Sequence, residues 1–267
     1  MPAPRIGILV VAYNAESTLR SVLERIPHDL RPRIEEIFVF DDASQDGTYE
    51  VGKVCQKEFA GTRLSIFRNP VNLMYGGNQI RGYQYAIERG FDIVVLLHGD
   101  GQYAPEVMAD LLRPLEEGRA DMVMGSRMLI PGAARRGGMP LYKFIGNKIL
   151  TFIQNRLVGL RLSEFHSGYR AYSVRMLRQI PLTRLTSNWH FDTQIILEVL
   201  KRGGRIVEVP IPTYYGNEIC RVNGIPYAMH CIASSLWFAI AHRWRLHAAL
   251  PAAQKPAEQP SADCPHS

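Results

Sequence analysis

Apolar residues in the first half of the chain fall into short continuous runs, and the segments between these runs have helical spacing. The runs lie at positions 6–12, 37–40, 64–67, 92–97 and 122–125. They predict strands buried on both faces of a parallel sheet, because helices cover both faces of such a sheet. The segments with helical spacing lie at 16–26, at 77–88 and from Thr48 onward. This alternation predicts an α/β fold with a doubly wound, mostly parallel central sheet flanked by helices.

The second half of the chain continues this pattern less regularly. Pro105 occupies a position where proline is tolerated, in the first turn of a helix predicted to run to about residue 117. The glycines and small residues of segment 131–138 predict a mobile basic loop that can close over a bound phosphate. Strands are predicted at 167–172 and 205–211, with a helix at 192–201 between them.

Two segments combine apolar residues with basic neighbours. Residues 141–158 have helical spacing and a basic opposite face, which suits either core packing or a helix that lies on a membrane. The apolar run 231–241 is shorter than the roughly 20 residues that a helix needs to cross a bilayer. This run therefore predicts an interfacial helix or a buried core helix.

The domain boundaries follow from this organisation. We predict a catalytic domain at residues 1–217, a C-terminal helical segment of membrane-interfacial character at 218–250, and a disordered tail at 251–267. The N-terminus leads into a strand pattern without a charged and then apolar leader, so we expect a cytoplasmic protein. The cysteines are too widely spaced for a zinc or redox motif, and we expect reduced thiols.

The net charge of +6 is unevenly distributed along the chain. Residues 122–163 contain no Asp or Glu, although seven Lys and Arg residues occur among them. A basic face of this length suits phosphates or the anionic leaflet of a membrane. We expect no nucleic-acid partner, because the chain has no nucleic-acid-binding motif and no aromatic stacking platform among these cations.

Two of the predicted strands end in carboxylates. Asp100 follows the run at 92–97, and Asp41 and Asp42 follow the run at 37–40. The carboxyl ends of parallel strands meet at one edge of the sheet, where open α/β sheets bind ligands. Carboxylates beside a glycine suit a divalent cation and leave room for a phosphate. The sequence therefore predicts a site for a metal-chelated nucleotide at this edge.

Several motifs follow one another in a characteristic order along residues 5–215. They are Ala12-Tyr13-Asn14-Ala15-Glu16, Asp41-Asp42-Ala43-Ser44-Gln45-Asp46-Gly47-Thr48, Gly99-Asp100-Gly101-Gln102-Tyr103, Gly125-Ser126-Arg127 and Ser167-Gly168-Tyr169-Arg170. In this order they resemble family 2 glycosyltransferases, most closely the polyprenyl-phosphate branch that includes dolichyl-phosphate mannosyltransferases. The resemblance implies a GT-A fold, a UDP- or GDP-sugar donor, a Mn or Mg ion, and transfer with inversion at the anomeric carbon.

The resemblance also implies roles for the residues at matching positions. The residues that would line the nucleoside pocket are Ala12, Tyr13, Glu16 and Asp42. Asp100 and Gln102 would face the metal and the diphosphate, and Arg127 would help to hold phosphate. The Ser167 to Arg170 segment would border the acceptor side, and we count Arg170 among the cofactor-binding residues.

Three positions depart from the family pattern. Val11 replaces a proline and Ala15 replaces an acid, which changes the shape of the predicted nucleoside pocket. His98 replaces the first aspartate of the D-x-D motif, so one carboxylate of the metal site is missing. Imidazole suits manganese better than magnesium, so a ligating His98 predicts weaker or manganese-leaning metal use. Alternatively, His98 has only a structural role.

The acceptor decides whether the reaction needs a general base. A lipid phosphate arrives ionised, whereas a hydroxyl acceptor must lose a proton to a base. Asp192 is our candidate base, with Glu164 and His166 as alternatives, and each is also open to a structural role. The cations from Arg127 to Arg161 favour a phosphate acceptor.

The leading interpretation is an inverting hexosyltransferase at the inner face of the cell membrane. It would move a sugar from a nucleotide-diphosphate sugar to a polyprenyl phosphate or a related envelope glycan, with Asp100, Arg127 and Asp192 as catalytic residues. A soluble transferase onto a saccharide hydroxyl and a catalytically silent nucleotide-sugar-binding protein are the alternatives. A nucleotidyltransferase is disfavoured, because segment 12–16 lacks a glycine-rich basic loop. We expect peripheral membrane contact, and a homo-oligomer is left open.

Overall fold

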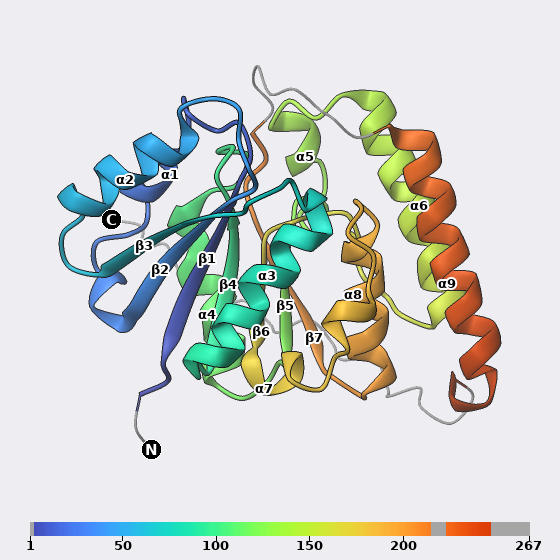
Figure 1. Cartoon of the computed structure of the whole chain (residues 1–267). Coiled ribbons are helices and arrows are strands. Elements are labelled where there is room, and N and C mark those ends of the chain that lie inside the picture. Colours follow the sequence, from blue (N-terminus) through green and yellow to red (C-terminus); the bar gives the residue numbers. More distant parts are fainter. Residues whose placement is uncertain (1–2, 215–222, 247–267) are drawn as a thin grey trace, which may run out of the picture.

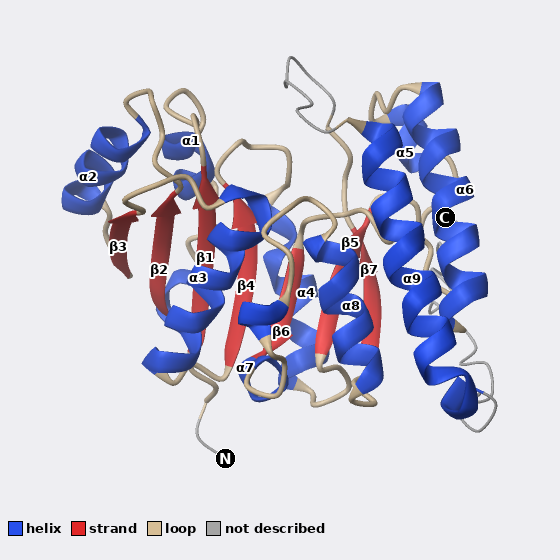
Figure 2. Cartoon of the chain, turned by 45° about the vertical axis from the view of Figure 1, so that its right-hand side comes forward, coloured by secondary structure: helices blue, strands red, loops and turns tan. Residues whose placement is uncertain are grey.

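A mixed β-sheet forms the centre of the computed structural model, which describes residues 3–214 and 223–246, the last four by backbone alone. Within these residues the strand order is β3-β2-β1-β4-β6-β5-β7 (Figures 1 and 2). The strands are β1 (Ile6–Ala12), β2 (Ile34–Asp41), β3 (Arg63–Arg68), β4 (Ile93–His98), β5 (Met122–Ser126), β6 (Arg170–Ser173) and β7 (Ile206–Pro210). All neighbouring strands run parallel except at β6, which is antiparallel to β4 and to β5. The predicted α/β class with a mostly parallel sheet is confirmed.

The single reversed strand leaves the other strands pointing the same way. Since β6 is antiparallel to both of its neighbours, β5 and β7 run in the direction of β1 to β4. The carboxyl ends of β1 to β5 and of β7 therefore lie at one edge of the sheet. We call this edge, with the loops that leave it, the site edge.

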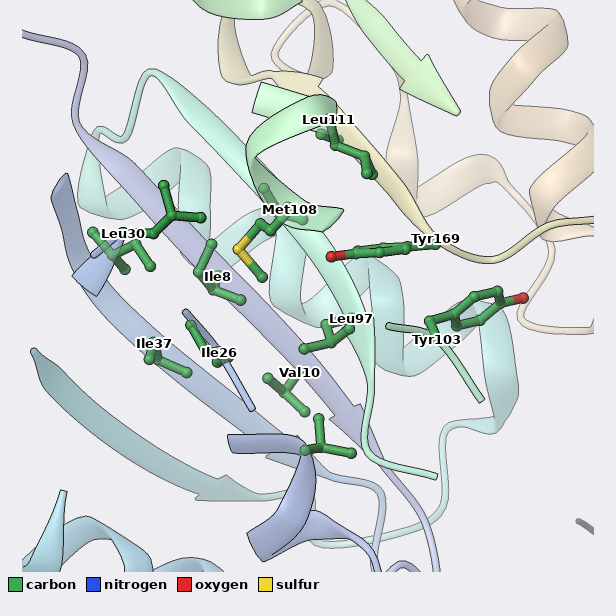
Figure 3. Close-up of a cluster of buried hydrophobic side chains, with 14 of the residues drawn as sticks. Ile8, Val10, Ile26, Leu30, Ile37, Leu97, Tyr103, Met108, Leu111 and Tyr169 are labelled. Atoms are coloured by element: carbon green, nitrogen blue, oxygen red, sulfur yellow. The ribbon is translucent and has the colours of Figure 1, made fainter. Parts of the chain in front are cut away.

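Helices cover both faces of the sheet (Figure 1). Their bounds are α1 (Leu19–Glu24), α2 (Thr48–Glu58), α3 (Met74–Arg89), α4 (Met108–Glu116), α5 (Ala133–Arg136), α6 (Leu141–Val158), α7 (Val174–Leu177), α8 (Phe191–Lys201) and α9 (Gly224–Leu246). Short 3₁₀ turns lie at Arg31–Arg33, Pro105–Val107 and Leu182–Arg184. One apolar cluster joins the sheet to α1, α2 and α4, and part of it is shown in Figure 3. A second cluster joins the other face to α3, α7 and α8.

Helices α6 and α9 lie side by side and outside α8 (Figures 1 and 2). The predicted helix at 141–158 agrees with the bounds of α6. The apolar run at 231–241 is only the middle of α9, whose stretch Gly224–His242 is long and apolar enough to cross a membrane by length and composition. The argument that this region is too short to span is therefore wrong. The tail predicted at 251–267 lies outside the described residues.

Some predicted elements differ in extent from those in the structure. The helix predicted at 16–26 is limited to α1, and the strand predicted at 167–172 begins only at Arg170. The segment 131–138, predicted as a loop, contains the helical turn α5. Ala134 of this turn is buried with Met139, so apolar contacts hold part of the segment against the domain. Spacing alone does not reveal these contacts, because the turn has too few residues for a periodic pattern.

Candidate functional site

The register of the sheet brings the predicted motif segments together at the site edge. Val11 of β1 pairs with His98, the last residue of β4. The N–H of Asp42 donates to the Ala12 carbonyl at 2.9 Å, and the N–H of Gly99 donates to the Val11 carbonyl at 2.9 Å. Ladder hydrogen bonds therefore fix the start of both carboxylate-bearing loops beside the end of β1.

Two of the residues predicted for the nucleoside pocket are buried. Asp42 is 3% exposed, and its Oδ1 accepts hydrogen bonds from Asn69 Nδ2 and from the Leu73 N–H, both at 2.8 Å. Burial raises the pKa of the Asp42 carboxyl above its ordinary value. Ala12 is also 3% exposed. These two residues lie beneath the surface at the site edge.

The other two predicted pocket residues lie at the surface. Tyr13 is 37% exposed, and Glu16 is exposed while its Oε2 accepts a hydrogen bond from the Gly47 N–H at 3.0 Å. Asn14 has a φ of +50° and Ala43 has a φ of +56°, a conformation that is uncommon for residues other than glycine. Such backbone conformations cluster at functional sites. Asn14 lies in the loop of the first motif, and Ala43 lies in the loop of the second.

Asp100 is exposed at the site edge. Its Oδ1 accepts a hydrogen bond from the Gln102 N–H at 3.0 Å, across Gly101 with a φ of +78°. Thr18 Oγ1 donates to the Gly99 carbonyl at 2.7 Å and holds the loop from the other side. The loop is therefore fixed by its backbone, and the exposed Asp100 carboxylate keeps further lone pairs for a cation.

His98 occupies a socket made largely of aromatic rings. Its ring centroid lies 5.7 Å from that of Tyr75 and 5.2 Å from that of Tyr103. A Cβ atom at Gly168 would lie 2.8 Å from His98 Nε2, so only glycine fits there, and the Gly168 N–H donates to the Tyr103 hydroxyl at 2.7 Å. Nε2 is buried and has no hydrogen-bond partner. Burial lowers the pKa of His98, so the imidazole is neutral at pH 7.

The wall of this socket is tied to the candidate base. The Tyr75 ring stacks on Trp189 with centroids 4.6 Å apart, and its hydroxyl donates to Asp192 Oδ2 at 2.7 Å. Asp192 is 5% exposed at the start of α8. Its Oδ1 lies 3.4 Å from Arg170 Nη1. One carboxylate oxygen therefore accepts a hydrogen bond from Tyr75, and the other lies beside the Arg170 charge without a hydrogen-bond partner among the described residues.

Arg170 lies behind the site edge and has no exposed surface. Its guanidinium donates to the carbonyls of Ser167 at 2.8 Å, Asp192 at 2.9 Å and Phe165 at 3.0 Å. The prediction that Arg170 contacts a cofactor does not agree with this burial. The guanidinium instead fastens residues 165–170, which include the predicted acceptor segment 167–170, to the start of α8.

Arg127 follows β5 and forms a nearly buried ion pair. Its side chain is 13% exposed, its Nε donates to Glu164 Oε1 at 3.0 Å, and its Nη2 donates to the His166 carbonyl at 3.1 Å. Glu164 is fully buried and also accepts from Asn147 Nδ2 at 2.8 Å. Burial alone would raise the pKa of Glu164, but the charge and hydrogen bonds of Arg127 bring it below its ordinary value.

His166 is held by a residue of α9. Its Nδ1 lies 2.9 Å from the Tyr227 hydroxyl, and its Nε2 is buried without a hydrogen-bond partner. Burial lowers the pKa of His166 to about 4. The ring is therefore neutral at pH 7 but only weakly basic. Among the described residues, each of the three predicted base candidates is thus engaged by neighbours or weakly basic.

The donor set at the site edge can be tested against a divalent cation. No group of three or more His, Cys, Asp and Glu residues within the described ranges could hold a metal by itself. His98 supplies a neutral ring and Asp100 an exposed carboxylate, with the Gln102 side chain close by in the same loop. Magnesium is usually bound by one or two carboxylates together with substrate phosphates. The exposed Asp100 carboxylate therefore suits a cation that takes its other ligands from a diphosphate, whereas Nε2 of His98 lies buried against Gly168 and would have to turn away from it to bind the same cation.

Some residues that shape the site were not predicted as site residues. Tyr75 and Tyr227 carry no motif signal, because their contacts with residues 192 and 166 span long distances in sequence. Tyr103 belongs to the motif at 99–103 and Gly168 to the motif at 167–170. The hydrogen bond between them follows only from the fold. A cavity of about 240 Å³ lies between α1 and α2, and none of the predicted site residues lines it.

Comparisons with known proteins identify the family and the fold. The family model for glycosyl transferase family 2 matches residues 7–181. A UDP-N-acetylglucosamine–dolichyl-phosphate N-acetylglucosaminyltransferase from Methanococcus voltae is 29% identical, over 79% of this chain and 86% of its own. An undecaprenyl-phosphate mannosyltransferase from Micrococcus luteus is 30% identical, over 80% of this chain and 85% of its own. The crystal structure of glucosyl-3-phosphoglycerate synthase from M. tuberculosis has a TM-score of 0.65 at 20% identity, over 88% of this chain and 81% of its own.

Proposed function

The chain is a glycosyltransferase that belongs to glycosyl transferase family 2, and we propose that it moves a sugar from a nucleotide-diphosphate sugar to a polyprenyl phosphate. The acceptor class is supported by the names of its relatives, which include a polyprenol monophosphomannose synthase from Mycolicibacterium smegmatis that is 28% identical. The chain covers most of the length of each of these relatives, 77% in that case. The donor is a UDP- or GDP-sugar in this proposal.

One observation favours a phosphate acceptor over a hydroxyl. Asp192 is engaged by Tyr75 and Arg170, and Glu164 is buried against Arg127. His166, with a pKa of about 4, is too weak a base to take a hydroxyl proton efficiently at neutral pH. A phosphate needs no such base, because it is already ionised. The alternative of a soluble transferase onto a saccharide hydroxyl would need one of these groups to be released.

In the proposed reaction an acceptor phosphate oxygen attacks the anomeric carbon. The bond from that carbon to the donor diphosphate breaks, and the leaving nucleoside diphosphate keeps the electron pair. A single displacement of this kind inverts the anomeric centre. Negative charge grows on the diphosphate as it leaves, so positive groups aimed at it stabilise the transition state. No proton has to move in this step.

We assign the described residues to the two ends of this reaction. Asp100, with His98 and the Gln102 side chain, would hold a Mn or Mg ion at the donor diphosphate, where the ion would offset the developing charge. Structures of the M. tuberculosis synthase include complexes with UDP and Mn²⁺ and with UDP and Mg²⁺. Arg127 would place positive charge beside the phosphates while Glu164 fixes its guanidinium. Asp192 is assigned a positioning role through Tyr75 and Arg170.

The nucleoside end is assigned to residues of the first two motifs. Ala12 and the buried Asp42 would form the floor under the base and ribose, and Tyr13 and Glu16 would lie at its surface. Because a polyprenyl chain resides in a bilayer, we place the enzyme in peripheral contact with the inner face of the cell membrane. The donor nucleotide is then drawn from the cytoplasm.

The test uses the full chain with a panel of UDP- and GDP-sugars, in Mn²⁺ or Mg²⁺. Polyprenyl phosphate is compared with the matching polyprenol, which differs only in the phosphate, and with a soluble alkyl glycoside. We expect a sugar phosphate lipid from the first acceptor alone, with NMR of the product showing an inverted anomeric centre. Transfer to polyprenol or to the glycoside would refute the phosphate acceptor. Donor binding without any transfer would instead support the silent nucleotide-sugar-binding alternative.

A further inference from the structure

Helices α6 and α9 present an apolar surface that is left exposed among residues 3–214 and 223–246. The exposed residues have helical spacing on each helix, and Phe152 is 70% exposed and Trp237 is 68% exposed. We call this set the outer face: Leu141, Tyr142, Ile145, Ile149 and Phe152 of α6, with Ile225, Met229, Leu236, Trp237 and Ile240 of α9. The two helices are in contact, so these exposed side chains lie along neighbouring helices. Large exposed apolar patches are rare on soluble monomers and indicate an interaction surface.

The charged residues of α6 and α9 are all basic. Residues 122–163 contain no acid, and neither does α9. Lys148 and Arg156 are exposed on α6. An apolar face edged by cations matches an anionic bilayer, in which acyl chains lie below acidic head groups. A second copy of the chain fits less well, because two such faces would bring like charges together.

We propose that the outer face docks in the plane of an anionic membrane. This inference rests on the proposed function, and it names the membrane-facing surface of that enzyme. Both helices follow strands that end at the site edge, α6 after β5 and α9 after β7, so both begin beside the site (Figures 1 and 2). The Tyr227 hydroxyl in the first turn of α9 lies 2.9 Å from Nδ1 of His166, the residue before the predicted acceptor segment 167–170. Docking would therefore bring the acceptor segment to the lipid head groups.

The contacts on the inner side of α9 favour an in-plane helix over a spanning one. Ser235 and Cys231 are fully buried. Gln154 Nε2 of α6 donates to Ser235 Oγ at 3.2 Å and to Thr193 Oγ1 at 3.3 Å, and Thr193 Oγ1 lies 3.3 Å from Cys231 Sγ. A helix that crossed the bilayer would have to leave α6 and α8 and break this polar layer. Although α9 is long enough to span a bilayer, its inner side packs against α6 and α8.

The first experiment measures flotation of the full chain with vesicles. Vesicles of phosphatidylcholine alone are compared with vesicles that also contain phosphatidylglycerol. The test variant carries Phe152→Glu and Trp237→Glu. The matched control is Val54→Glu, since Val54 is 44% exposed on α2, far from the outer face (Figure 1). We expect flotation with the anionic vesicles, and binding at least about tenfold weaker in the double variant, because a carboxylate opposes both the acyl region and the acidic head groups. Thermal unfolding of both variants checks their folding.

The second experiment separates docking from chemistry. The double variant should lose transfer to long-chain polyprenyl phosphate in vesicles and keep transfer to a short, water-soluble prenyl phosphate. Unchanged flotation of the double variant would overturn the proposal, as would resistance of the wild type to extraction at alkaline pH, which indicates a spanning helix. A dimer that the variant splits would assign the face to a second copy. If the wild type floats with anionic vesicles but transfers no sugar, the result would support the docking surface and refute the proposed function.

Discussion

Replacement of Asp100 by alanine is the most direct test of the donor side of the site. The Asp100 carboxylate is exposed, and its hydrogen bond is to the Gln102 N–H within its own loop. Loss of one such bond should change the free energy of unfolding by only about 1 kcal/mol. The catalytic effect should be much larger, because removal of one electrostatic contact to a developing charge costs about 3 kcal/mol of transition-state stabilisation. That cost corresponds to a loss of roughly a hundredfold in turnover.

The assay measures initial rates at saturating donor and Mn²⁺, together with thermal unfolding. Asp110→Ala is the matched control, because Asp110 also has an exposed carboxylate, paired with Arg113 on α4. We expect Asp100→Ala to lose turnover with an unfolding temperature close to that of the control. Near-normal turnover of Asp100→Ala at saturating cation would remove this carboxylate from the mechanism. A collapse of the unfolding temperature would instead show a structural role for it.

Further predictions concern the buried pairs and the socket. Glu164→Gln leaves the Arg127 charge without its partner and should lower the free energy of unfolding by about 3–5 kcal/mol in urea titrations. The pKa of His166 is about 4 in the folded protein and 6.5 in the unfolded chain. As the pH falls, the unfolded chain therefore binds a proton at this residue before the folded protein does. The contribution of His166 to the free energy of unfolding should be complete above pH 6.5 and fall by about 3 kcal/mol towards pH 4. In His166→Gln, the free energy of unfolding from urea titrations should therefore depend less on pH between about pH 7 and 5. His98→Asp should raise the ratio of rates in Mg²⁺ to rates in Mn²⁺, and an unchanged ratio would argue against ligation by His98.

Local patterns were sufficient to predict much of the fold. The bounds predicted for β1 and α6 agree with the structure, because the apolar run of β1 and the helical spacing of α6 are each complete within the segment. The meeting of the Asp42 loop and the Asp100 loop also followed from sequence, since parallel strands share their carboxyl edge. These predictions needed only the runs of apolar residues and the polar residues that follow each run.

Features that depend on pairing between distant segments could not be predicted in this way. The insertion of β6 between β4 and β5, antiparallel to both, is not encoded in any local spacing. The burial of Arg170 follows from that insertion, because the strand carries its first residue into the second core cluster rather than to the surface. A motif position can therefore identify Arg170 as important without showing whether it contacts a ligand.

Asp192 shows why the identity of a general base is hard to read from a sequence. The residue follows Trp189-His190-Phe191, and nothing in that segment indicates what the carboxylate contacts. Its partners come from α3, through the Tyr75 hydroxyl, and from β6, through the Arg170 guanidinium. A base must direct a free lone pair at the acceptor. Here Oδ2 accepts a hydrogen bond from Tyr75, whereas the buried Oδ1 has no hydrogen-bond partner within the described part of the chain and lies 3.4 Å from Arg170 Nη1. The same contacts keep Tyr75 against His98, and we propose that Asp192 acts on the donor side by positioning this socket. A reaction whose acceptor arrives ionised is compatible with that role, because it leaves the carboxylate in its present contacts.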